Sequence, residues 1–186
     1  MLFLRELINK TYTMKKTIYW LSNPPVSGPA SILFIRIMTG GVFFWEGLLK
    51  FAYPNQGVGR FTKLGFPFPE FTAHFVGTAE IIGGLLILFG LFTRFVALYF
   101  IIQMIIAVLT TKISLYLGTS PLPAPPAPPK TGLWAVLHEI MSDYAKILTV
   151  NFLLIEGPGL VSLDHRFKKM KAVNLRAKYT STILQQ

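Results

Sequence analysis

The sequence predicts an all-α integral membrane protein, specifically a four-transmembrane-helix, up-down bundle with both termini in the cytoplasm. The composition is 52% hydrophobic and only 14% charged, and the mean hydropathy is +0.52, which is unlike a soluble domain. Four apolar runs have the length of about 20 residues that a hydrocarbon core of about 30 Å requires. Basic residues flank the first and last runs, and the positive-inside rule places such flanks in the cytoplasm.

The four runs are continuously apolar rather than alternating, so helices and not barrel strands are the expected spanning elements. We expect these helices at about 31–52, 71–92, 94–112 and 138–156. The chain then divides into a cytoplasmic extension, a membrane domain and a basic cytoplasmic tail, at residues 1–30, 31–165 and 166–186. Residues 1–13 are polar and unpatterned, and no secondary structure is predicted for them.

The net charge of +10 comes largely from basic residues at the two ends of the chain, beside the membrane. These are topology signals that also contact anionic lipid, so the expected partner is the bilayer and not nucleic acid. The chain has no cysteine, and its three histidines lie in separate segments. A disulfide, a dithiol redox centre and a zinc site are therefore not expected. Any electron transfer would need a bound cofactor.

The first predicted span carries a stripe of small and charged residues. At 100° per residue, Arg36, Gly40, Gly47 and Lys50 fall on one side of the helix, and Glu46 lies one turn before Lys50. Small residues let another helix approach closely, so this face should point into the bundle. The following loop, 53–70, is rich in aromatic residues and suits the membrane interface, where its GRFTKLG segment is a candidate short surface helix. The favoured role of this segment is anchoring at the interface, and the alternative is a lid over the outer end of the bundle.

The second predicted span places Glu80 between Gly77 and Gly84 on its close-packing face, near mid-membrane. A charge in hydrocarbon costs at least roughly 2.5 to 3.5 kcal/mol. Glu80 must therefore pair with a cation, become protonated or hold a bound group. His74 lies nearer the outer surface.

The last two spans differ in polarity. The third span is nearly uncharged, with Gln103 as its main polar group, and is expected to face lipid over much of its surface. The loop that follows contains a proline-rich segment, 119–132, which favours an extended polyproline II spacer. The fourth span carries Glu139, Asp143 and Lys146 at helical spacing, a polar stripe that must meet partners.

Several segments stand out together along the chain: Arg36 with Gly40 and Gly41, GLLKF at 47–51, LGFPFPEF at 64–71, AEIIGGLLILFGLFTR at 79–94 and GPGLVSLD at 157–164. In this order they resemble the DoxX family of small four-helix bacterial membrane proteins. The resemblance carries over onto Arg36, Gly47, Lys50, Glu80, Gly83, Gly84, Arg94, Gly157, Gly159 and Asp164, and it does not imply which of them touch a ligand.

The resemblance implies a multi-pass protein of the bacterial cytoplasmic (inner) membrane. Some members are similar to a subunit of a quinone-linked oxidoreductase, and others are linked to membrane redox assemblies that handle oxidative stress. The expected function is therefore a membrane subunit of a redox assembly, with a quinone as the candidate cofactor and other membrane or redox subunits as candidate partners. The alternatives are a small-molecule or ion carrier and a non-catalytic assembly protein.

Depth along each helix, at about 1.5 Å per residue, sorts the buried charges into two layers. The outer layer is either a pocket for a small polar or quinone-like molecule or an ion network that fixes helix register, with Glu80 and Lys146 expected at its centre. Its candidate residues are Glu46, Lys50, Glu80, Asp143, Lys146 and His74. The inner layer is expected to be structural, with Arg36 contacting Glu156 or Asp164. Its residues are Arg36, Arg94, Glu156 and Asp164.

Overall fold

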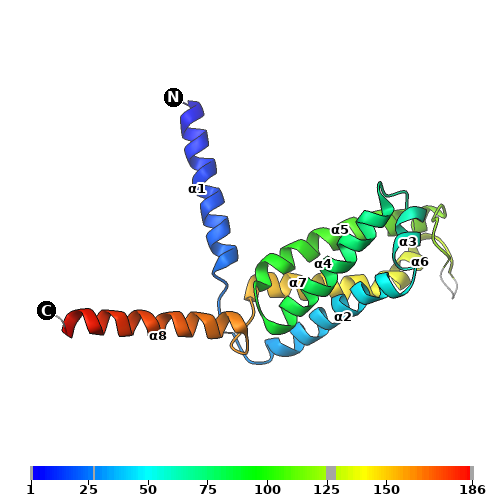
Figure 1. Cartoon of the computed structure of the whole chain (residues 1–186). Coiled ribbons are helices and arrows are strands. Elements are labelled where there is room, and N and C mark those ends of the chain that lie inside the picture. The colour runs from blue at the N-terminus through cyan, green and yellow to red at the C-terminus, as the bar shows by residue number, and fades with distance from the viewer. Residues whose placement is uncertain (1, 27, 125–128, 185–186) are drawn as a thin grey trace.

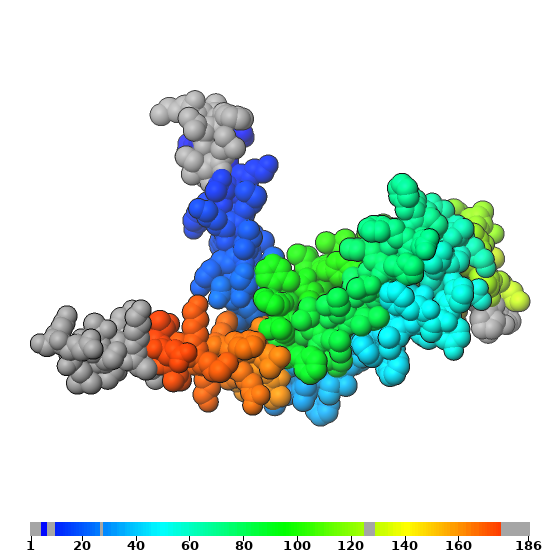
Figure 2. Space-filling view, viewed as in Figure 1, coloured from blue at the N-terminus to red at the C-terminus, as the bar shows by residue number. Residues whose placement is uncertain are grey.

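The computed structural model describes residues 2–26, 28–124 and 129–184, and all regular structure in these ranges is helical (Figure 1). Four helices pack into a bundle: α2 (Ile32–Ala52), α4 (Pro69–Phe89), α5 (Thr93–Leu117) and α7 (Met141–Glu156). The short helices α3 (Val58–Lys63) and α6 (Gly132–Glu139) lie at one end, called here the loop end. Helices α1 (Leu2–Ser22) and α8 (Leu163–Leu184) project from the opposite end, called the terminal end (Figures 1 and 2).

Three helices in the described part of the chain, α2, α4 and α5, are long and apolar enough to cross a membrane. This confirms an all-α membrane protein. Their positions agree with the first three predicted spans to within a few residues, except that α5 continues to Leu117. The predicted fourth span differs more, because α7 has only 16 residues and a break at Ile140 separates it from α6.

Three segments outside the bundle are also the subject of expectations from the sequence. The prediction of no secondary structure for residues 1–13 is wrong for residues 2–13, which belong to α1. The GRFTKLG segment does form a short helix, α3. In the proline-rich segment, residues 125–128 lie outside the described residues, and residues 119–124 contain no helix or strand.

Helices α2 and α4 make the closest contact in the bundle, and glycines allow it. A Cβ added to Gly40 would lie 2.6 Å from the carbonyl oxygen of Gly84, and one added to Gly47 would lie 2.7 Å from that of Gly77. The two contacts are two helical turns apart on α2. They let the backbones of α2 and α4 approach closely, as small residues do in other pairs of membrane helices. The prediction that this face of the first span points into the bundle is thus confirmed.

The apolar core fills the half of the bundle next to the terminal end. Phe43 of α2 stacks on Phe100 of α5 with ring centroids 3.7 Å apart, and both side chains are at most 1% exposed. Ile87, Val150 and Leu153 complete this core from α4 and α7 and are fully buried. The half next to the loop end is built differently, with charged side chains around a cavity.

Candidate functional site

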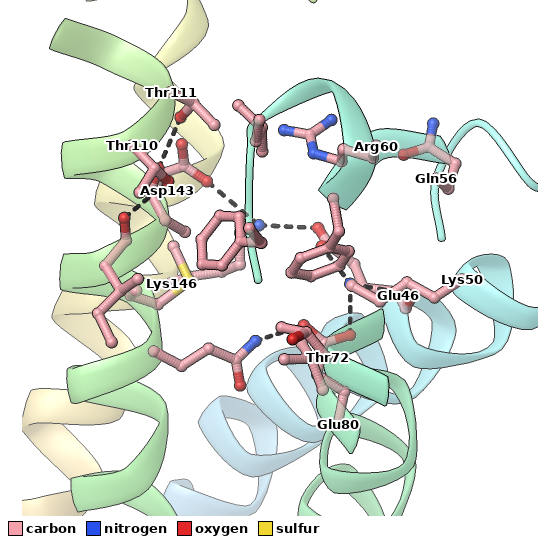
Figure 3. Close-up of a pocket in the computed structure, with 18 of the residues that line it drawn as sticks. Glu46, Lys50, Gln56, Arg60, Thr72, Glu80, Thr110, Thr111, Asp143 and Lys146 are labelled. Carbon is pink, nitrogen blue, oxygen red and sulfur yellow. Dashed lines mark hydrogen bonds and ion pairs between the residues drawn. The ribbon is translucent and has the colours of Figure 1, made fainter. Parts of the chain in front are cut away.

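The cavity has a volume of about 560 Å³ and lies between the bundle helices at the loop end (Figure 3). Its size is in the range of ligand pockets, which are typically about 300 to 1,000 Å³. Helix α3 and the loop around it cover one side with Arg60, Phe61 and Phe66, and the bundle helices supply polar and aromatic walls. The cavity therefore combines an apolar lining with a restricted set of polar groups.

A continuous chain of ion pairs runs along one wall of the cavity. It begins at Glu80, whose Oε2 lies 2.5 Å from Nζ of Lys50. Lys50 also faces Glu46 at 3.9 Å, and Glu46 Oε1 lies 2.7 Å from Nζ of Lys146. Lys146 continues to Asp143 at 3.3 Å. Acids and bases alternate along this chain, so each charge has an opposite neighbour.

Helix α5 contributes to both ends of the chain. Asp143 also contacts Nζ of Lys112 at 3.3 Å, and Lys112 donates a hydrogen bond to the carbonyl oxygen of Glu139 at 2.9 Å. At the deep end, the Gln103 amide donates to Oε1 of Glu80. Helix α5 exposes apolar side chains over much of its surface, as the sequence suggested, and in addition forms part of the polar wall.

The polar layer contains most of the predicted residues but with a different pairing. The predicted contact between Glu80 and Lys146 is wrong, because Lys50 is the partner of Glu80 and Lys146 binds Glu46 and Asp143. The reason is the close approach of α2 and α4. A Cβ on Gly77 would lie 3.4 Å from Cβ of Lys50, which directs the lysine toward Glu80, less than one turn away.

His74 is the one predicted pocket residue that does not line the cavity. Its side chain is exposed, and its ring stacks on Phe51 with centroids 5.5 Å apart. Sequence reasoning instead missed Lys112 and Arg60 as cavity residues. One signal was available, since basic residues at the ends of spans are concentrated on the side of the chain termini, whereas Lys112 and Arg60 lie at the loop end.

The arginines at the terminal end bind backbone carbonyls rather than carboxylates. Arg36, 2% exposed, donates from Nε to Ile87 at 2.8 Å and from its terminal nitrogens to Leu88, Pro158 and Val161. Within the described residues Arg36 forms no ion pair with Glu156 or Asp164, so the predicted direct contact is wrong, although Asp164 lies near enough to act on Arg36 electrostatically. These carbonyls belong to the end of α4 and to the turn after α7, where helix termini leave acceptors without partners.

The turn at Gly90 is shaped around this arginine. Gly90 has φ +66°, and an added Cβ would lie 2.7 Å from Cζ of Arg36. Arg94 closes the adjacent corner by donating to the carbonyls of Trp20 at 2.8 Å and Ile155 at 2.6 Å, with its guanidinium 3.8 Å from the Trp20 ring centroid. Both arginines thus fasten turns and termini to the bundle.

The two acidic residues of the predicted inner layer lie at its margin. Glu156 is exposed, and Asp164 accepts a long hydrogen bond of 3.5 Å from the Phe92 backbone N–H. Burial raises the pKa of the Asp164 carboxyl above its ordinary value, while the backbone N–H groups of Phe92 and Thr93 act in the opposite direction.

Comparison with known proteins agrees with this architecture. Residues 31–113 match the DoxX family model. The chain is also 38% identical to the "Uncharacterized membrane protein Rv3486" of Mycobacterium tuberculosis, over 76% of this chain and 84% of that protein. The chain belongs to the DoxX family. This DoxX protein is 31% identical to the "Putative oxidoreductase CatD" of Bacillus subtilis, over 78% of this chain and 93% of that protein. No solved structure matches the chain significantly.

Proposed function

We propose that this DoxX protein is a membrane subunit of a bacterial redox assembly and that its loop-end cavity binds a quinone. The observation that carries the proposal is the joint lining of the cavity, with an ion-pair chain on one wall and aromatic rings such as Phe61, Phe66 and Tyr99 on others. The relative named an oxidoreductase supports the redox class.

The ionisable residues of the cavity suit the proton transfers that accompany quinone reduction. A bound quinone supplies an acceptor for two electrons and two protons. Glu46 is the most exposed carboxylate of the ion-pair chain, with 41% of its side chain accessible, so it is placed to exchange protons with the cavity. Lys146 and Lys50 hold this carboxylate in position. In this proposal the two electrons come from a redox centre carried by a partner subunit of the assembly.

The proposal includes a topology in the bacterial cytoplasmic (inner) membrane. Helix α7, together with α6, forms the fourth crossing, and both termini lie in the cytoplasm, since the basic flanks favour that side. Cysteines introduced at Asn55 and Lys130, both exposed, should react with an impermeant thiol reagent in intact cells. Reaction of cysteines introduced at Lys10 and Lys171 instead would show that the protein has the opposite orientation.

The direct test is to purify the protein in mild detergent, record its absorption spectrum and analyse an organic extract by mass spectrometry. A quinone present in near-equal amount to the protein would support the proposal. Glu46→Gln should lower quinone-dependent electron transfer in the reconstituted assembly while the protein stays folded. Absence of any quinone, combined with no thermal stabilisation by added quinone, would contradict it. Solute uptake into proteoliposomes would then favour the carrier.

A further inference from the structure

Helix α5 carries an outward-facing apolar stripe, one member of which also lines the cavity. Phe95, Leu98, Ile102, Ile105 and Leu109 recur at helical spacing and are between 38% and 54% exposed. On a candidate membrane span, such a stripe faces lipid. Ile102 belongs to this stripe and is also part of the cavity lining. The cavity therefore reaches the outer surface of α5 at Ile102.

Helix α4 shows the same overlap. Its outward stripe contains Phe71, Phe75, Ile82 and Phe89, which are between 53% and 71% exposed. Phe75 lines the cavity as well. Because α2 packs mainly along α4 and α5 mainly along α7, the seam between α4 and α5 is less tightly packed than either pair. Phe75 and Ile102 thus line the cavity and are also exposed on the outer surfaces of the two helices that flank this seam.

Arg60 differs from the other cations of the cavity. Lys50, Lys112 and Lys146 each contact a carboxylate, whereas the described residues offer Arg60 no carboxylate within ion-pair distance. Figure 3 shows its guanidinium on the segment covering the cavity, directed over the polar layer. A guanidinium presents a planar set of donors that suits an oxygen acceptor. It is thus a free donor at the loop end of the cavity.

We propose that the cavity takes a membrane-dissolved amphiphile that enters sideways between α4 and α5. Its oxygen-bearing head accepts hydrogen bonds from Arg60, and its apolar tail leaves past Phe75 and Ile102 into lipid. The inference rests on the proposed function only for the location of the site. It adds the entry route, the need for a tail and the residue that recognises the head.

The entry route is tested with a quinone that carries a photoreactive diazirine in its tail, added to the whole protein in lipid nanodiscs. Labelling should concentrate on the α4 and α5 peptides that contain Phe75 and Ile102, and an excess of unlabelled tailed quinone should compete it away. Ile102→Trp should suppress this labelling. Ile105→Trp is the matched control, because Ile105 is similarly exposed but does not line the cavity. Uniform labelling of all outward faces, without competition, by both this quinone and a redox-inactive tailed phenol ether would overturn the proposal.

Head recognition is tested by Arg60→Gln, with Lys63→Gln as a control that removes a charge from the same short helix without touching the cavity. A hydrogen bond from a charged donor is worth about 1.5 to 3 kcal/mol, so Arg60→Gln should weaken binding of the tailed quinone by roughly tenfold or more. Equal affinity in the Arg60→Gln and Lys63→Gln variants would overturn the role of Arg60.

A redox-inactive, tailed phenol ether separates this inference from the proposed function. Suppose that the ether labels the α4 and α5 seam, that unlabelled ether competes this labelling away, and that the tailed quinone gives no specific labelling. This result would support entry from the lipid and contradict the proposal that the ligand is a quinone. Specific binding of a tail-less quinone alone would keep the redox function and overturn the side entry.

Discussion

The two halves of the bundle provide different partners for their buried charged side chains. At the terminal end, Arg36 and Arg94 donate to backbone carbonyls, and an apolar core with Phe43 stacked on Phe100 fills the space beside them. At the loop end, lysines and carboxylates pair with one another along a cavity. One half is filled and the other retains room for a ligand.

This difference indicates which charges are structural. A guanidinium and a carbonyl do not change protonation at ordinary pH, so the arginine contacts take no part in proton exchange. A lysine–carboxylate chain can exchange protons, but buried networks of that kind also occur without a function. The cavity beside the chain is what favours a site, and the predictions below separate the two halves by experiment.

The largest effect is expected for Arg36→Leu. Removing the guanidinium removes four hydrogen bonds to carbonyls of the α4 end and the α7 turn, which should lower the free energy of unfolding by about 3 to 5 kcal/mol. Thermal unfolding in detergent measures this. Lys171→Leu on the exposed part of α8 is the control and should change stability by less than about 0.5 kcal/mol. A similar small effect for both would mean that the terminal end does not depend on its arginine.

The second effect concerns the pairing of Glu80 with Lys50. Glu80→Gln and Lys50→Met should each cost about 2 to 4 kcal/mol, since each leaves an opposite charge uncompensated, and the double variant should recover at least about 1 kcal/mol. A second cycle, between Glu80 and Lys146, should show weaker coupling because these residues do not touch. Stronger coupling in the second cycle would contradict the pairing described here.

A smaller effect separates helix packing from charge. Gly40→Ala places a methyl group 2.6 Å from the Gly84 carbonyl and should destabilise the α2 and α4 pair by about 1 to 3 kcal/mol. Gly41 has nothing within 4 Å of its added Cβ, so Gly41→Ala should be neutral or stabilising by up to about 1 kcal/mol. Equal unfolding temperatures for the two variants would show that the helices do not meet at Gly40.

The smallest effect is expected at Asp164. Because burial raises the pKa of its carboxyl, the native state binds that proton more tightly than the unfolded state, and stability falls as pH rises through the interval between the two pKa values. Asp164→Asn removes this dependence. The stability of the variant relative to the natural protein should therefore increase from pH 4 to pH 7, as followed by thermal unfolding. A relative stability that falls over this range would contradict the direction.

The sequence was sufficient for the fold class and for the presence of a polar layer, but not for its pairing. Periodicity placed Gly40, Gly47 and Glu80 on inward faces, because the side of a helix on which a residue lies follows from the spacing within that helix alone. The partner of Glu80 depends on how two helices rotate against each other, which Gly47 and Gly77 decide in three dimensions.

The terminal end illustrates the same limit. A buried arginine suggested a carboxylate partner, but the acceptors of Arg36 are main-chain carbonyls that every residue carries. No side-chain pattern in the sequence marks them. Arg60 was similarly missed because its place over the cavity depends on how the segment containing α3 folds back onto the bundle.

The measurement that tests the central claim most directly is native mass spectrometry of the quinone-loaded protein in three forms: the natural chain, the Glu80→Gln/Lys50→Met double variant and Arg36→Lys. If the loop-end chain forms a ligand site, the natural chain and Arg36→Lys should retain the quinone, whereas the double variant should lose it although its thermal unfolding remains cooperative. Full retention by the folded double variant would show that the ion-pair chain only holds the helices in register.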